Sequence, residues 1–166
     1  LVNLQFHKND WYVRRARGIL HERASKGAVN EETHIELRKH LESQSDPGRK
    51  LRALWALHVT GGITHENLTD LLASEHEYIR AWAIQLLCED MHPGDTALEK
   101  FVSMARKDSS PIVRLYLASA LQRVPEASSW KIATGLLTRG EDAEDHNIPK
   151  MIWFGIEPHV TKDPSR

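Results

Sequence analysis

Five basic residues recur along the chain at similar intervals, and each has the chemistry to bind an anion. They are Arg14, Arg52, Arg80, Arg114 and Lys150, at spacings of 38, 28, 34 and 36 residues. A base that faces a groove can bind a carboxylate or a phosphate through charge-assisted hydrogen bonds. The alternative is a ladder of ion pairs between neighbouring units, because a buried base needs a partner. Acids or hydroxyls that precede the bases could supply it: Asp10, Asp46, Glu77, Asp108, Ser110 and Asp145.

Four aromatic residues follow these bases at a distance of two or three residues. They are Trp55, Trp82, Tyr116 and Trp153. If they share one face, they form a row on which a peptide, a sugar or a base can stack. The alternative is packing between neighbouring helices, since large aromatic side chains are highly buried on average. The sequence leaves both interpretations open.

The segment 141–145 is acidic and is followed by His146 and Asn147. Its carboxylates are ligands that suit calcium or magnesium. The spacing of the acids matches no calcium-binding loop, however, so we expect no metal site. An acidic start to a helix is the favoured alternative, because the helix dipole stabilises negative charge there. A contact surface for a neighbouring domain is a third interpretation.

Nothing in the chain resembles a catalytic constellation or a cofactor motif. Cys88 and His92 lie four residues apart, but two ligands do not make a zinc site, and Cys88 is expected in the core. The chain contains no haem-attachment motif, no nucleophile elbow and no glycine-rich phosphate loop. We therefore expect a non-catalytic chain without a cofactor.

Composition places few limits on function. The chain has 166 residues, of which 40% are hydrophobic and 27% charged, with a net charge of −1. This balance does not favour a phosphate-binding protein, and no apolar run is long enough to span a membrane. The chain begins with Leu1, not Met, and contains no apolar segment of the kind found in signal peptides. We interpret it as one domain, residues 1–166, excised from a longer protein.

The elements that must position these residues are helices. Residues 77–88 form a segment that is apolar on nearly every side, so its helix must be covered by others. Similar segments predict inner helices near 11–24, 47–60, 75–90, 111–124 and 147–157. More polar outer helices alternate with them, and no strand is expected. The first pair lacks most of its outer helix, so helix 11–24 is expected to expose an apolar edge.

These helix pairs, each with a base early in its second helix, resemble HEAT repeats across the whole chain. The resemblance implies an all-α fold: a right-handed α-α superhelix, or HEAT-like solenoid, of about five helix pairs with the first incomplete. It also implies that the second helix of each pair lines the concave side. Stability in such arrays comes mainly from contacts between neighbouring repeats.

Six segments carry a more specific resemblance. They are NDWYVRRAR (9–17), LRALWALH (51–58), RAWAIQLLC (80–88), VRLYLASALQR (113–123), EDAEDHN (141–147) and WFGIEP (153–158). They resemble the HEAT region of the large membrane-bound dehydrogenases of planctomycete-type bacteria. In that family the region lies between a sugar-dehydrogenase-like propeller and a c-type haem domain. The resemblance implies a periplasmic or cell-envelope location and places the family's chemistry in its other domains.

The expected function is therefore a scaffold or docking module that binds other domains of the same protein or a protein partner. The candidate binding residues, on the concave face, are Arg52, Trp55, Arg80, Trp82, Arg114, Tyr116, His146 and Asn147. The alternative is a nucleic-acid-binding protein similar to the HEAT-like DNA alkylation repair glycosylases. Acids share the inner helices with the bases, so we do not expect nucleic acid to bind.

Overall fold

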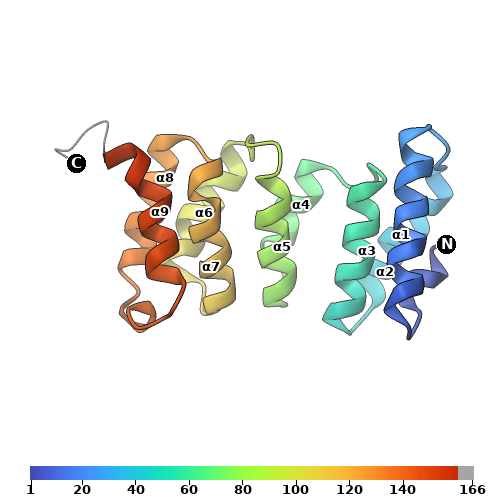
Figure 1. Ribbon diagram of the computed structural model, residues 1–166, viewed down its shortest axis with the longest axis horizontal. Helices are drawn as coiled ribbons and strands as arrows, with labels where there is room; N and C mark the ends of the chain where they lie inside the picture. The colour runs from blue at the N-terminus through green and yellow to red at the C-terminus, as the bar shows by residue number, and fades with distance from the viewer. Residues whose placement is uncertain (161–166) are drawn as a thin grey trace. The chain divides into compact units, whose positions relative to one another are not determined.

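The computed structural model describes residues 1–160, and all regular structure in that range is helical (Figure 1). The elements are η1 (Asn3–Phe6), α1 (Asp10–Ser25), α2 (Glu31–Ser43), α3 (Pro47–Val59), α4 (His65–Leu71), α5 (Glu77–Leu87), α6 (Asp95–Lys107), α7 (Pro111–Ala120), η2 (Leu121–Arg123), α8 (Glu126–Leu137), η3 (Gly140–Asp142) and α9 (Ile148–Val160). The expected all-α class is confirmed for this range. None of these helices is both long and apolar enough to cross a membrane.

Polar side chains define where the helices begin. The carboxylate of Asp46 accepts a hydrogen bond from the Arg49 amide at 2.7 Å, and the Ser110 hydroxyl accepts one from Val113 at 3.3 Å. Asn30 caps α2 in the same way, by accepting a hydrogen bond from the Thr33 amide. Such caps satisfy amide groups that have no partner inside the helix. These side chains therefore fix where α2, α3 and α7 begin.

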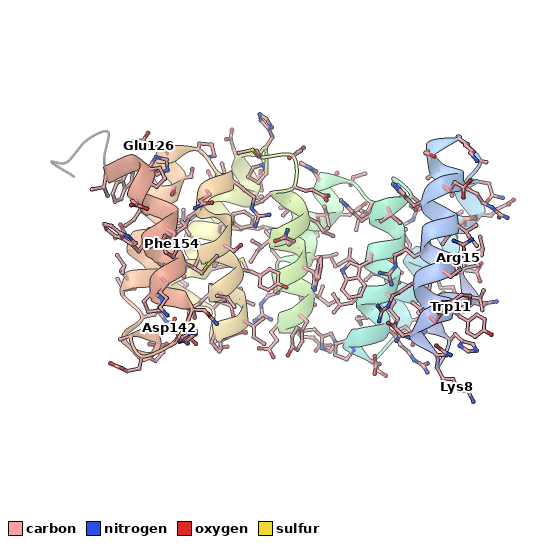
Figure 2. The ribbon with its side chains drawn as sticks, in the orientation of Figure 1. Lys8, Trp11, Arg15, Glu126, Asp142 and Phe154 are labelled. Atoms are coloured by element: carbon pink, nitrogen blue, oxygen red, sulfur yellow. The ribbon has the colours of Figure 1, made fainter. Side chains whose placement is uncertain are left out.

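The chain divides into two compact units, and the N-terminal unit comprises residues 1–67. In it α3 packs against both α1 and α2, and η1 packs against α1 and α3. Its core contains Val2, Leu20, Leu37, Ala56 and Leu57. Trp11 is 64% exposed, and its side chain projects from α1 (Figure 2). The large exposed apolar side chains of α1 are thus Trp11 and Tyr12, both at its start.

The C-terminal unit begins at residue 68, within α4, and contains α5 to α9. Helices α5, α7 and α9 form one layer, in which α7 contacts both of the others (Figure 1). Helices α6 and α8 pack together behind them, and α8 also contacts α7 and α9. The fully buried side chains include Ile84, Phe101, Leu117, Leu121 and Ile132. This two-layer packing holds α5, α7 and α9 in a fixed order.

Three of the predicted inner helices differ from their expected bounds. Helix α5 spans Glu77–Leu87 and is shorter at both ends than the expected 75–90. Helix α7 stops at Ala120 and continues as the 3₁₀ turn η2, and α9 extends to Val160 through Pro158. A proline inside a helix has no amide hydrogen for the carbonyl four residues before it, here that of Phe154. The side-chain amide of Gln122 donates to this carbonyl at 2.9 Å. A side chain from η2 thus compensates for the hydrogen bond that Pro158 cannot make.

Candidate docking groove

Arg80 is engaged in an ion pair across neighbouring inner helices. Its Nε and Nη2 donate to the two carboxylate oxygens of Asp108, each at 2.8 Å. Its Nη1 donates to the carbonyl of Ser74 at 2.9 Å. Asp108 immediately follows α6 and precedes α7, so the pair connects α5 to the start of the next inner helix. These partners lie in the same compact unit as Arg80, so this part of the chain itself holds the guanidinium in place.

Arg114 repeats this arrangement one helix pair later, on α7. Its Nε and Nη2 donate to the carboxylate of Asp142, with Nη2 at 2.6 Å, and its Nη1 donates to the carbonyl of Asp108 at 2.9 Å. In both cases the carboxylate lies 28 residues after the arginine and the carbonyl 6 residues before it. The hydrogen bond to Asp142 is the main reason that the pKa of Arg114 is raised. We call these two pairs the Arg–Asp ladder.

The Arg–Asp ladder includes two residues of the binding face that the sequence proposes, Arg80 and Arg114. Arg114 is only 2% exposed and Arg80 is partly buried, and both guanidinium groups bind carboxylates of the chain. The ladder interpretation predicted pairing, and Asp108 is one of the acids it named. Asp142, the partner of Arg114, is not among the acids that it named. Asp145 instead accepts hydrogen bonds from the amides of Asn147 and Ile148 at the start of α9.

Arg52 and Trp55 lie in the N-terminal unit, on α3. The Nη2 of Arg52 donates to the Asp10 carboxylate at 3.3 Å, and its Nη1 donates to the carbonyl of His7 at 3.2 Å. The guanidinium of Arg17 lies 4.9 Å from the centre of the Trp55 ring, a cation–π distance. Arg52 thus joins α3 to the start of α1.

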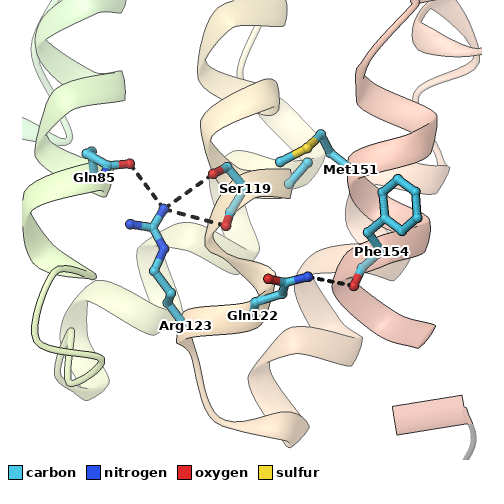
Figure 3. A pocket seen from close by; sticks show the side chains of 7 residues that line it. Gln85, Ser119, Gln122, Arg123, Met151 and Phe154 are labelled. Carbon is cyan, nitrogen blue, oxygen red and sulfur yellow. Dashed lines mark hydrogen bonds between the residues drawn. The ribbon is translucent and has the colours of Figure 1, made fainter. Parts of the chain in front are cut away.

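Two adjoining hollows run over α5, α7 and α9, and together we call them the docking groove. One has a volume of about 410 Å³ and the other about 510 Å³, and both are lined by Gln85, Ser119 and Met151. Three residues named from the sequence line the first hollow, namely Trp82, Tyr116 and Asn147, together with Leu115. The second is lined by Ala118, Gln122, Arg123 and Phe154 (Figure 3). The groove therefore brings together three of the eight residues that the sequence proposes.

Helical periodicity explains which side chains line the groove. Residues three, four or seven positions apart lie on the same face of a helix. This relates Trp82 to Gln85 on α5, and Tyr116 to Ser119 on α7. The rings of Trp82 and Tyr116 lie with their centres 6.3 Å apart and their planes tilted by 54°. Adjacent helices thus offer an aromatic surface beside a polar one.

Arg123 lies at the end of η2, in the second hollow. Its Nη2 donates to the side-chain oxygen of Gln85 at 3.1 Å and lies 3.4 Å from the Ser119 hydroxyl. Figure 3 shows the guanidinium between these two side chains. Sequence reasoning missed Arg123, Gln85 and Ser119. Arg123 is seven residues after Tyr116, so the same helical spacing that relates Tyr116 to Ser119 could have identified it.

The acidic segment has structural roles. Asp142 pairs with Arg114, and Glu141 pairs with Arg139 at 2.6 Å. The pKa of Asp145 is lowered by hydrogen bonds from the backbone amides of Ile148 and Asn147. His146 is exposed beside the groove and does not line it. Within residues 1–160, no group of three or more His, Cys, Asp or Glu residues is placed to hold a metal ion.

Cys88 and His92 do not form a site. Cys88 is fully buried at the end of α5, and burial raises the pKa of its thiol to about 11. The Nδ1 of His92 instead lies 2.7 Å from the carbonyl of Asp90. We expect an aromatic disulfide reagent to modify Cys88 about 100-fold more slowly, or slower still, in the folded chain than in guanidinium chloride, because the thiol must first be exposed. Equal rates at pH 8 would contradict this burial.

Comparisons with known proteins assign no family to the chain, so its function is inferred from the groove and the residues that line it. No protein-family model matches the chain, and no curated protein is significantly similar to it.

Proposed function

We propose that the chain is a non-catalytic docking module whose docking groove binds an extended segment of a protein. The observation that carries this proposal is the groove itself, which continues over three successive inner helices. It combines aromatic and apolar surface with amide and hydroxyl groups, the combination that peptide and small-ligand sites use for affinity and orientation. The residues proposed to contact the segment are Trp82, Gln85, Tyr116, Ser119, Asn147 and Met151.

The resemblance to HEAT repeats supports the same proposal. In a right-handed HEAT-like superhelix the second helix of each pair lines the concave side. Helices α5, α7 and α9 are the second helices of the pairs α4–α5, α6–α7 and α8–α9. The Arg–Asp ladder would then join successive repeats. We further propose that the parent protein is a multidomain, dehydrogenase-like protein of the periplasm or cell envelope. The docked segment would come from another of its domains or from a protein partner.

Nucleic acid is a poorer match to this groove. Binding to a phosphate backbone requires several accessible bases, each of which neutralises a phosphate. Arg123 is the one base among the residues that line the two hollows, and the neighbouring Arg80 and Arg114 are paired with aspartates. We therefore favour a protein segment as the ligand of the groove.

The proposal is tested with an array of eight-residue peptides and two aromatic variants. Trp82→Ala and Tyr116→Ala should each raise the dissociation constant of the tightest-binding peptide by about 30-fold or more, since buried aromatic side chains dominate the affinity of such interfaces. Trp153→Ala and Tyr78→Ala are matched controls, because these side chains are 51% and 47% exposed and do not line the groove. Dissociation constants from fluorescence anisotropy give the comparison. Equal losses in the controls would overturn the proposal.

A further inference from the structure

Arg123 differs from the other arginines of the same layer in what it contacts. Arg80 and Arg114 each bind an aspartate through two nitrogens. Arg123 contacts only neutral groups, namely the Gln85 side-chain oxygen and the carbonyl and hydroxyl of Ser119. Within residues 1–160, no carboxylate lies within ion-pair distance of it. The charge of this half-buried guanidinium is not compensated by the described part of the chain.

The geometry of Arg123 leaves donors available. A guanidinium carries five N–H donors, and all of its hydrogen bonds within residues 1–160 are made by Nη2. The N–H groups on Nε and Nη1 are therefore available to a ligand. Gln85 and Ser119 hold the planar group from two different helices, α5 and α7 (Figure 3). A donor that is held in place loses less entropy when it binds.

The rest of the groove has no competing charge. The other residues that line the two hollows are aromatic, aliphatic, amide, hydroxyl or thioether side chains, with no acid and no second base. A carboxylate is the anion that a planar guanidinium matches with two parallel hydrogen bonds. A ligand of this groove should thus carry one carboxylate to pair with Arg123, because a second carboxylate would have no basic partner among the lining residues.

We propose that the docked segment carries an Asp or Glu side chain that pairs with Arg123, and an apolar side chain that lies against Trp82 and Tyr116. This proposal rests on the proposed docking function and specifies its ligand. Arg123 lies seven residues after Tyr116, a rise of about 12 Å, because four of these steps lie in α7 at about 1.5 Å each and three lie in the 3₁₀ turn η2 at about 2.0 Å each. An extended peptide advances about 3.3 Å per residue. The acid and the apolar residue of the docked segment should therefore lie about three or four positions apart.

The test uses peptides with one apolar residue and one Glu at separations from one to six positions, each paired with a Gln version. On the unmodified chain the Glu peptide with a separation of about three or four positions should bind about 10–100-fold more tightly than its Gln version. On Arg123→Gln this preference should disappear, and on Arg123→Lys part of it should remain. A substitution that only disturbs the structure should weaken the Glu and Gln peptides equally. Loss of the Glu-over-Gln preference therefore indicates that an ion pair has been removed.

Arg106→Gln is the matched control for charge. It removes the same charge from an exposed position on α6, outside the groove, and should keep the full preference for Glu. Thermal unfolding followed by circular dichroism checks that each variant is folded.

The possible results separate this inference from the proposed function. If Glu and Gln peptides bind equally to the unmodified chain and Trp82→Ala still weakens both, the carboxylate inference is wrong and the docking function stands. If no peptide binds at millimolar concentration, both are wrong. If a short oligothymidine binds and acidic peptides do not, the groove accepts phosphates and the inference is overturned.

Discussion

Replacing Asp142 by alanine is expected to lower the free energy of unfolding by about 3–5 kcal/mol, because it leaves a buried charge without a partner. Arg114 is 2% exposed and donates to Asp142 through both Nε and Nη2. The pair joins the loop before α9 to α7, so its loss should also loosen the last inner helix. Denaturant unfolding followed by circular dichroism measures the change.

Two further variants show whether the effect comes from the pair. Glu144→Ala removes an exposed carboxylate from the same acidic segment and should leave stability nearly unchanged. The double variant Arg114→Met with Asp142→Leu should recover much of the loss, since replacing both ions of a buried pair by apolar groups is often neutral. A double variant as unstable as Asp142→Ala would show that the loop geometry, and not the unpaired charge, causes the loss.

Replacing Gly155 by alanine is expected to destabilise the chain by about 1–3 kcal/mol, although alanine favours helices, because the close packing of α9 leaves no room for a methyl group. A Cβ atom at Gly155 would lie 2.5 Å from the Cβ of Leu121 and 2.7 Å from its Cδ1. The Cβ atom of Leu121 cannot rotate away, so the helix itself must shift. Denaturant unfolding at 25 °C provides the measurement.

Gly18 in α1 is the matched control, because a Cβ atom there would meet nothing within 4 Å. Gly18→Ala should therefore stabilise its helix by about 0.5–1 kcal/mol through the lower backbone entropy of the unfolded chain. The same substitution is thus expected to have opposite signs at the two positions. A stabilising Gly155→Ala would contradict the close contact between α9 and Leu121.

Periodicity and turn chemistry were enough to predict the helices from the sequence. The apolar faces of segments such as 77–88 and caps such as Asn30 and Asp46 depend only on local sequence. Asp108 was named among the acids that precede the bases, but its pairing with Arg80, rather than with Arg114 which it precedes, depends on how α5 packs beside α7. Asp142 was not named, because only the path of the loop brings it, rather than the nearby Asp145, to Arg114.

The groove was predictable only in part. Trp82 and Tyr116 were named because they follow the bases, yet Arg80 and Arg114 are bound within the ladder while the aromatic side chains line the hollow. Arg123 lies outside the recurring pattern of bases, so its role depends on the packing of η2 between neighbouring helices. The hydrogen bond from Gln122 to α9 likewise requires the relative position of two elements.

The measurement that tests the docking groove most directly is a titration of the isotope-labelled chain with the tightest-binding acidic peptide, followed by two-dimensional NMR. We predict that the largest shifts occur at Trp82, Gln85, Tyr116, Ser119 and Arg123, which line the two hollows. The indole signal of Trp82 should move, and that of the exposed Trp11 should not. Shifts concentrated on α1 and α2, or no shifts at saturating peptide, would contradict the account.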